Sequence, residues 1–381
     1  MAHVVVLGGG FGGVAAAHEL VSDHPQLEVT LIDRRDVFFM GFAKLWDLGR
    51  VRPLAEGTRS LRALADRGIR YLQTSIEGLD PATRTVTTAD GPIEADAVLV
   101  ALGAAKAPKH LDMLGGDGAH DLYDAAALPD IHRDLDAVES GEVLVSILGG
   151  PFQCPPAPYE AALVVAERLR ERGRGEAVRV RVSTPQPMAL PVAGVDASRY
   201  IADRLGDHGV TLLSGKAVRD VDDVGRVVTF ADDTTAGFDV LLGVPAAVAP
   251  SLLVDAGLTG GSGFVEPDRH TLQTSFDRVY AVGDCTHIPT ATGALPKAGV
   301  FAAAQGQVAA RNIAADLTGS APASFDGHGM CFLELPGHQV AFVEGDFYAE
   351  PEPDVTLRDA DDELYRRKVA YEASRLEAWF G

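Results

Sequence analysis

The sequence has few basic residues, few cysteines and no long apolar run, and each shortage excludes a class of function. Only 33 of the 381 residues are lysine or arginine, against 54 acidic residues. The resulting net charge of −21 would repel nucleic acid and anionic lipid over most of the surface. No stretch has the unbroken apolar length of a membrane span. A nucleic-acid partner and a membrane-spanning role are therefore not expected.

Motifs of several other enzyme classes are also missing. The histidines show no spacing typical of a metal-ligand pair, so no metal site is expected. A nucleophile elbow G-x-S-x-G and a P-loop are absent as well. These absences leave glycine-rich turns and a few cysteines as the informative features.

The composition is that of a globular protein. A hydrophobic content of 46% argues against disorder, and the length allows two or three domains. The first strand begins at His3 or Val4 and leaves no room for a signal peptide, so we expect a cytoplasmic location. In that compartment the three cysteines are not expected to form structural disulfides, although a catalytic dithiol pair is compatible with it.

The first glycine turn predicts a dinucleotide site. A buried strand runs into Gly8, Gly10 and Gly13, which fit G-x-G-x-x-G and aim a helix N-terminus at a pyrophosphate. Asp33 ends the next strand, twenty residues after Gly13, where its carboxylate can bind an adenosine ribose. The cofactor-binding residues predicted here are Gly8, Gly10, Phe11, Gly12, Gly13, Asp33 and Gly103.

An internal duplication predicts two such folds. The tripeptide at 7–9 reappears at 148–150, and the hairpin and strand at 86–99 reappear at 228–242. We therefore expect an α/β chain with two Rossmann-like domains and a small C-terminal α+β segment. The expected FAD domain is discontinuous, over 1–108 and 238–319. The second, degenerate NAD-like domain covers 109–237 and an interface segment covers 320–381.

The second turn has lost what a nicotinamide cofactor needs. Pro151 stands where Gly10 stands in the first copy, and four prolines between 151 and 158 remove backbone N–H donors. The second strand ends in Ser183 and Thr184, without a ribose-binding acid. The same turn contains Cys154, which indicates redox chemistry at sulfur.

A later motif indicates which dinucleotide binds. The strand from Val279 ends in Gly283 and Asp284, and Asp284 can bind a ribityl hydroxyl, a contact that only a flavin dinucleotide requires, so FAD is the expected cofactor. A small-residue helix is predicted to start near Pro296, with Pro296 in its first turn. Its dipole and Lys297 could stabilise negative charge on a reduced flavin, although a solvated lysine is the alternative.

Together these residues resemble the sulfide:quinone oxidoreductases and the flavoprotein subunit of flavocytochrome c sulfide dehydrogenase, within the flavoprotein disulfide-reductase superfamily. The resemblance rests on the motifs at 154–160, 281–284, 296–305 and 331–334, and on the closing 379–381. It implies that Cys154 and Cys331 form a redox pair beside FAD, that a small sulfur substrate is oxidised, and that a quinone or another acceptor receives the electrons. Residues 105–148 contain no third cysteine, unlike many quinone-reducing members.

Three further residues have two interpretations each. Glu160 could relay protons to an acceptor or stabilise the start of its helix. Cys331 would be an ordinary strand cysteine without the resemblance, and Cys285 is expected to pack beneath the cofactor rather than to act in catalysis.

The C-terminal helix from Leu364 to Phe380 also has alternatives. It could contact the inner membrane face peripherally, or it could pack on the core or form a homodimer. In the membrane interpretation the residues near lipid are Arg366, Arg367 and Lys368, and the apolar anchors are Tyr365, Val369, Leu376, Trp379 and Phe380.

Two rival functions stay open at this stage. A type II NADH:quinone dehydrogenase has the same fold, cofactor and acceptor, but the prolines and the missing ribose acid count against it. A flavin-bound redox switch or sensor would use the cysteine pair to change conformation instead of turning over.

Overall fold

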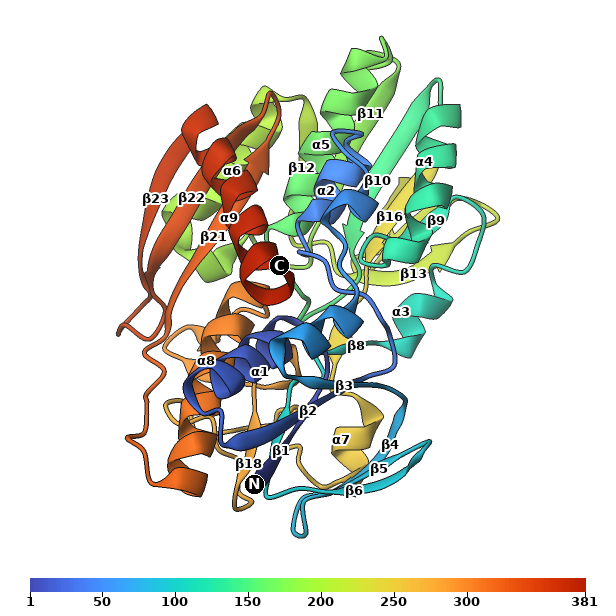
Figure 1. Cartoon of the computed structure of the whole chain (residues 1–381). Helices are drawn as coiled ribbons and strands as arrows, with labels where there is room; N and C mark the ends of the chain where they lie inside the picture. The colour runs from blue at the N-terminus through green and yellow to red at the C-terminus, as the bar shows by residue number, and fades with distance from the viewer.

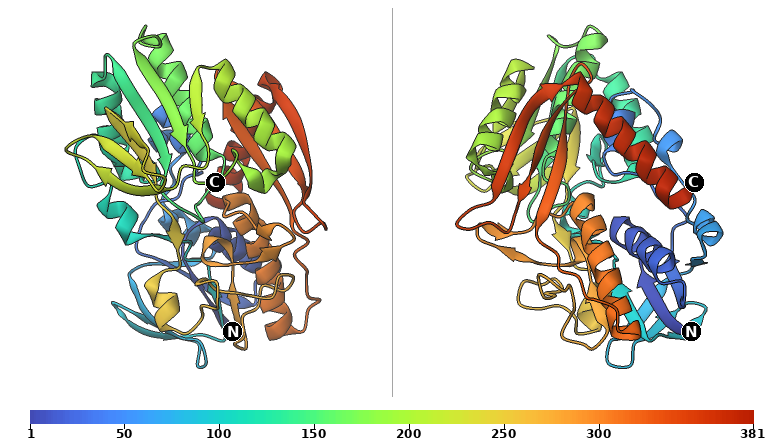
Figure 2. Two further views of the ribbon diagram at one scale, coloured as in Figure 1. Left: turned by 180° about the vertical axis from the view of Figure 1, so that it is seen from behind. Right: turned by 60° about the vertical axis from the view of Figure 1, so that its left-hand side comes forward.

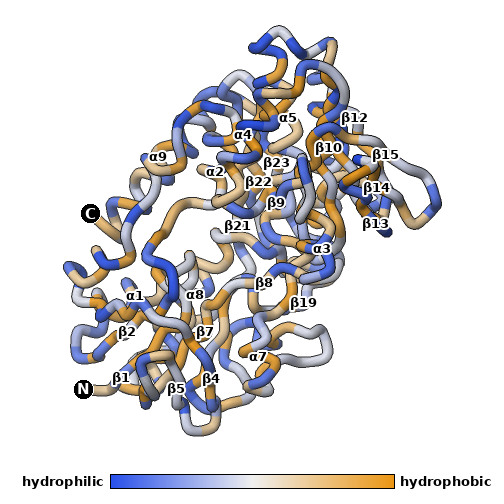
Figure 3. The backbone as a smooth tube through the Cα atoms, turned by 90° about the vertical axis from the view of Figure 1, so that its right-hand side faces the viewer, coloured by the Kyte–Doolittle hydropathy of each residue, from blue (hydrophilic) through white to orange (hydrophobic).

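Two parallel sheets form separate domains and a small antiparallel sheet lies beside them in the computed structural model, which describes all 381 residues (Figure 1). The first sheet is parallel throughout because its strands are joined by crossovers rather than by hairpins. Its central strands are apolar along most of their length, as the hydropathy colours of β1, β2 and β7 show in Figure 3, and they are almost fully buried. Its strand order is β18 (Val279–Ala281), β7 (Ala97–Val100), β1 (Ala2–Leu7), β2 (Leu27–Asp33) and β3 (Arg70–Gln73).

Two helices of small residues pack against each other on this sheet, α1 (Phe11–Asp23) and α8 (Gly299–Thr318). A Cβ on Gly306 would lie 2.2 Å from the backbone oxygen of Gly12, so glycine is required for this approach. The prediction that α8 begins near Pro296 is wrong, because the first helical residue is Gly299. Pro296 and Lys297 therefore lie in the loop that precedes α8.

The second sheet repeats the first. Its order is β12 (Val210–Leu213), β11 (Val178–Ser183), β10 (Gly141–Ile147), β16 (Val240–Val244) and β9 (Ala119–Asp121), again parallel throughout. Each domain also has a three-stranded hairpin sheet: β4 (Ile76–Asp80), β5 (Thr85–Thr88) and β6 (Gly91–Glu94) in the first, and β13 (Val218–Asp222), β14 (Val227–Phe230) and β15 (Thr235–Gly237) in the second. The predicted α/β class and the duplication are confirmed.

The predicted boundary at residue 238 falls too early. Strand β16 pairs in parallel with β10, so it belongs to the second sheet. The chain returns to the first domain only after this strand, through β17 (Ala247–Val248), which pairs with β8 (Ala105–Lys106). These two short strands are the two connections between the domains.

The remaining elements cover the sheets or connect them. Helices α4 (Leu128–Ala137), α5 (Ala157–Glu171) and α6 (Gly194–Asp207) belong to the second domain. Short helices and strands in the connections are α2 (Ala43–Leu48), α3 (Pro108–Asp112), α7 (Ser251–Asp255), β19 (Pro289–Thr290) and β20 (Gly293–Ala294).

The C-terminal segment joins both domains. Its antiparallel sheet consists of β21 (His328–Leu335), β22 (Gln339–Asp346) and β23 (Asp354–Asp361), followed by α9 (Asp362–Phe380). One face of this sheet contributes Leu333, Ala341 and Val343 to the core of the second domain. Helix α9 runs across the segment toward the first domain (Figure 2), where Leu376 and Trp379 join the other core.

This packing corrects part of the membrane interpretation of α9. Lys368 is 0% exposed, and Leu376 and Trp379 are buried in protein, so these three side chains do not face lipid. Val369, Arg366 and Arg367 are exposed, and membrane contact through them stays a prediction. No helix of the chain combines the length and the apolar character needed to cross a membrane.

Candidate active site

The first glycine turn has the geometry of an anion-binding loop. Gly8 has a φ of +107°, which favours glycine, and a Cβ on Gly13 would lie 1.9 Å from the Gly8 oxygen. A Cβ on Gly10 would instead meet no atom within 4 Å, so this side of the turn is open. Helix α1 begins here with no side-chain cap and no acidic residue in its first turn. Its free N–H groups suit a pyrophosphate.

The other predicted nucleotide residues surround this turn. Asp33 is buried, and its two carboxylate oxygens accept hydrogen bonds from the backbone N–H groups of Gly9 and Arg35, each at 2.8 Å. It therefore fixes the turn against the end of β2. Phe11 packs edge-on against Phe38, and Gly103 has a φ of +66° in the loop after β7.

Asp284 has a buried carboxylate oxygen without a hydrogen-bond partner. Its Oδ2 accepts a hydrogen bond from Gln153 Nε2 at 2.7 Å, whereas its Oδ1 is buried without any partner. Burial raises the pKa of this carboxyl. Because buried polar atoms are normally satisfied, the free oxygen fits a hydroxyl of a bound ligand. Together with the open glycine turn, it fits the ribityl and pyrophosphate groups of FAD.

Lys297 is anchored next to Asp284 rather than free in solvent. Its Nζ donates to the backbone oxygens of Asp284 and Thr286 at 2.8 and 2.9 Å, and it lies 3.6 Å from the centroid of the Phe264 ring. Burial lowers the pKa of this lysine. The interpretation of Lys297 as a solvated lysine is therefore wrong, and its action on a reduced flavin stays a prediction.

The second turn is bound to this loop by its backbone. The N–H of Cys154 donates to the oxygen of Lys297 at 2.7 Å, and the oxygen of Cys154 accepts from Tyr123 Oη at 3.1 Å. Cys154 has a φ of +45°, which is uncommon for a residue with a side chain. The turn thus places Cys154 beside the Asp284 loop of the first domain.

A cleft of about 310 Å³ opens where the second turn meets the first domain. Its wall includes Pro151, Pro155 and Pro191, with His287 and Lys297 among the polar lining residues. Prolines cannot donate backbone hydrogen bonds, so the wall offers few groups for a pyrophosphate.

Cys331 reaches the same place from strand β21. The carboxylate of Glu160 in the first turn of α5 accepts a hydrogen bond from the backbone N–H of Glu334 at 2.6 Å, which fixes β21 beside α5. Cys331 lies three residues before Glu334, and Cys154 lies three residues before α5 begins. Both cysteines are free and keep part of their residue surface exposed, whereas Cys285 is buried in the core of the first domain.

A buried ion cluster lies next to the two thiols. Lys368 Nζ is 2.6 Å from Glu334 Oε2 and 3.9 Å from Glu160 Oε1, and all three residues are buried. Helix α5 has no side-chain cap, but Glu160 lies in its first turn, where an acid complements the helix dipole as one of the two interpretations expected. Its carboxylate also contacts the C-terminal segment.

The electrostatics of the site keep the thiols protonated. Burial, and then the charge of Glu160, raise the pKa of Cys154 to about 12. Burial, and then the charge of Cys154, raise the pKa of Cys331. Burial raises the pKa of Glu160 to about 7, so this carboxyl can exchange a proton near neutral pH.

Sequence reasoning missed several residues of this site, namely Lys44, Tyr123, Gln153 and Glu334. It also assigned Lys368 to lipid contact. A signal for Lys368 exists in α9, because Leu364, Lys368, Glu372 and Leu376 recur every four residues and share one buried face. Two opposite charges on such a face indicate buried pairing. Tyr123 and Gln153 have no comparable sequence signal.

Comparisons with known proteins agree with this geometry. The family described as pyridine nucleotide-disulphide oxidoreductase matches residues 2–306. The chain is 27% identical over 347 residues to the sulfide-quinone reductase of Aquifex aeolicus, covering 83% of this chain and 76% of that protein. It is 32% identical over 265 residues to the NAD(P)H dehydrogenase (quinone) of Mycobacterium tuberculosis, covering 65% and 46%.

A solved structure also resembles the whole fold. The X-ray structure of the sulfide:quinone oxidoreductase from Aquifex aeolicus superimposes with a TM-score of 0.89 at 23% identity, covering 100% of this chain and 92% of that one. The likeness includes the C-terminal segment that carries Cys331 and lies beyond the residues matched by the family.

Proposed function

Because the chain belongs to the pyridine nucleotide-disulphide oxidoreductase family, we propose that it is a FAD-dependent oxidoreductase that oxidises sulfide, or a related small sulfur nucleophile, through Cys154 and Cys331. The electrons leave through the flavin to a quinone. The observation that supports this proposal is that Glu160 in the first turn of α5 accepts a hydrogen bond from Glu334 of β21, which holds the strand of Cys331 beside the helix that follows Cys154.

FAD is the cofactor, and bound FAD supplies a two-electron acceptor. The glycines of the first turn hold its pyrophosphate, and Asp284 Oδ1 binds its ribityl chain. Cys154 is the thiol next to this site, because its backbone is bonded to Lys297 and its neighbour Gln153 is bonded to Asp284.

This placement gives the two cysteines different roles. Hydrosulfide attacks Cys331 Sγ of the oxidised pair, an S–S bond forms between substrate and Cys331, and the Cys154–Cys331 bond breaks. Cys154 Sγ leaves with the electron pair as a thiolate. A second nucleophile then removes the outer sulfur, and re-formation of the disulfide releases two electrons to the acceptor.

The Glu160–Lys368 pair supports proton transfer at this site. Glu160 titrates near neutral pH, and Lys368 holds its carboxylate between α5 and β21. A quinone takes up two protons together with two electrons, so a buried acid of this pKa suits its reduction.

The NADH dehydrogenase alternative has less support from this structure. The second turn offers prolines where a nicotinamide dinucleotide needs N–H donors, and α5 places a carboxylate in its first turn. A quinone acceptor requires access to lipid, so peripheral membrane contact stays a prediction, and a homodimer does too.

Serine substitutions test the cysteine assignment. We expect that Cys154→Ser and Cys331→Ser each keep bound FAD but lower its reduction by sulfide by about a hundredfold or more, because no disulfide can form. The matched control is Cys285→Ala, which removes the third thiol and should leave the rate close to that of the wild type. A wild-type rate in either serine variant would contradict the proposal.

A further inference from the structure

Lys44 lies near the two thiols, and its ammonium group forms no ion pair with a carboxylate. Its Nζ donates to the backbone oxygen of Tyr123 at 3.0 Å and lies 5.3 Å from the centroid of the Tyr123 ring. It makes no ion pair, whereas Lys106 is paired with Asp121 and Lys368 with Glu334. Lys44 is half-buried, and Cys154, Asp121 and Asp124 are the groups whose charges favour its protonated form.

The contacts of Lys44 lead to Cys154. Tyr123 accepts from Lys44 through its backbone oxygen, and its hydroxyl donates to the backbone oxygen of Cys154 at 3.1 Å. The charges that act on the Cys154 thiol are those of Glu160, Lys44 and Lys368. Lys368 is held by two carboxylates, so Lys44 is the cation there whose charge is not already offset by an ion pair.

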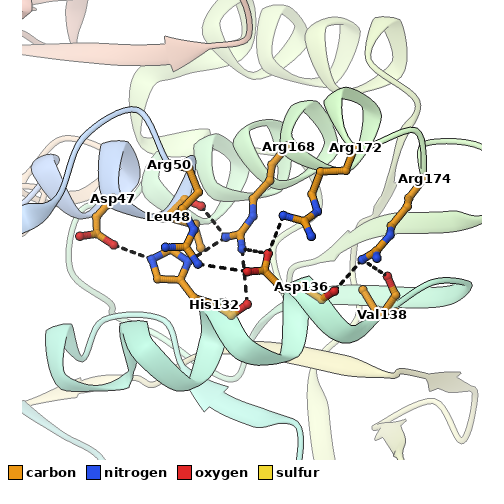
Figure 4. A network of polar contacts seen from close by, with 9 residues as sticks. All are labelled: Asp47, Leu48, Arg50, His132, Asp136, Val138, Arg168, Arg172 and Arg174. Carbon is orange, nitrogen blue, oxygen red and sulfur yellow. Dashed lines mark hydrogen bonds and ion pairs between the residues drawn. The ribbon is translucent and has the colours of Figure 1, made fainter.

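A polar network holds Lys44 in this place. Lys44 lies on α2, which belongs to the first domain in sequence but packs against α5 of the second. Figure 4 shows how the two are joined: Asp47 Oδ1 is 2.6 Å from His132 Nε2, and Arg168 donates to the oxygen of Leu48 at 2.9 Å. Arg168 also contacts His132 Nδ1 and Asp136. The network fixes the C-terminal end of α2, three and four residues after Lys44.

We propose that Lys44 is a positioning residue for the sulfur chemistry, and that its ammonium group stabilises the thiolate that leaves from Cys154. This inference rests on the proposed function. In the step concerned, hydrosulfide forms an S–S bond to Cys331, the disulfide breaks, and the electron pair stays on Cys154 Sγ. Lys44 keeps its proton and contributes charge alone.

The need for such a charge follows from the burial of the site. A thiol whose pKa is raised to about 12 is a poor leaving group, because thiolates of low pKa leave faster. An opposite charge within a few ångströms lowers a pKa by about one to three units.

Lys44 is itself protonated at neutral pH. Burial and the charge of Lys106 lower its pKa to about 8, while Cys154, Asp121 and Asp124 act in the opposite direction. The contribution of Lys44 should therefore be present below pH 8 and fade above it.

The test measures Cys154 directly, without turnover. The FAD-loaded protein is reduced under nitrogen, and alkylation of Cys154 by iodoacetamide is followed between pH 6 and 10 by site-resolved mass spectrometry. We expect Lys44→Met to raise the pKa of Cys154 and to slow its alkylation at pH 7 by about threefold or more. Each unit of increase in this pKa lowers the thiolate population about tenfold, but it makes the remaining thiolate about threefold more nucleophilic. Lys44→Arg should retain the rate and exceed the wild type above pH 8, because arginine keeps its charge.

Lys109→Met is the matched control, since Lys109 is exposed and its loss should change nothing. Equal alkylation in wild type and Lys44→Met would overturn the proposal. If Lys44→Met does not fold, identical pH profiles of Lys44→Arg and wild type would overturn it instead. Flavin reduction by sulfide in the wild type is measured separately, so a failure of the proposed function is distinguished from a failure of the Lys44–Cys154 coupling.

Discussion

The two Rossmann-like domains share a sheet topology and differ in what their first turns hold. Both have a parallel sheet of five strands and a three-stranded hairpin sheet. Four strands have the same spatial order in the two sheets, whereas the fifth, at the edge, follows the other four in the first domain (β18) and precedes them in the second (β9). In the first domain, the turn after β1 is open at Gly10 and α1 starts without an acid. In the second, the turn after β10 holds Cys154 and α5 starts with buried Glu160.

The difference shows that topology fixes where a site forms and that a few residues fix its chemistry. Each turn lies at the carboxyl end of a central strand, facing the other domain. An open backbone there suits an anion. A proline-rich turn offers few N–H donors for one, and here it carries Cys154 instead.

The largest expected effect concerns Lys368, the buried cation that compensates the charge of Glu160 beside the second turn. Lys368→Met should destabilise the protein by about 3–5 kcal/mol, because Glu160 and Glu334 would remain buried without a counterion. Urea unfolding of the FAD-saturated protein measures this change. Arg366→Met, on the exposed side of the same helix, is the control and should cost less than about 1 kcal/mol. Equal losses in both variants would contradict the importance of the buried cluster.

A smaller effect is expected from glycine substitutions at a crowded position of the first turn and at an open position of the second. Gly13→Ala should cost about 1–3 kcal/mol and weaken FAD binding, because its Cβ would collide with the Gly8 oxygen. Gly150→Ala should leave FAD content unchanged, because a Cβ there meets no atom within 4 Å. FAD content after gel filtration and thermal melting provide the readouts. An equal loss of FAD in both variants would contradict the claim that the two turns differ in FAD binding.

The smallest expected effect is a pH slope from Glu160. Its pKa is raised to about 7 in the folded protein by burial, from an ordinary value of 4.5. The folded state then binds more protons than the unfolded state between these values, so this group's contribution to stability is lost as pH rises toward 7. Urea midpoints at pH 5, 6, 7 and 8 should fall more steeply for the wild type than for Glu160→Gln. Parallel curves would show that Glu160 does not titrate as described.

Much of the fold could be predicted because its signals are local. Glycine spacing, buried strands and the acid at the end of β2 are set by residues close in sequence, and the repeat between the domains made the second sheet recognisable. The boundary at 238 was misplaced because it put β16 in the first domain. The internal duplication makes β16 the counterpart of β7, so β16 belongs to the second sheet, where it pairs with β10.

The parts of the site that were missed depend on contacts distant in sequence. Lys368 meets Glu160 across 208 positions, and Lys44 reaches Tyr123 across 79. A basic helix face and a buried ion cluster have similar compositions, and only the packing of α9 against the sheet distinguishes them. The pairing of Cys154 and Cys331 was predicted from the family resemblance and stays a prediction, whereas the charged residues around them were not predicted.

The most direct test of the central claim, that electrons enter from sulfur and not from a nicotinamide, is an anaerobic titration of the FAD-loaded protein. Flavin absorbance at about 450 nm is followed during separate additions of sulfide and NADH. We predict bleaching by sulfide and none by NADH. Bleaching by NADH alone would contradict the account, because it would show that the proline-rich second turn still serves a nicotinamide cofactor.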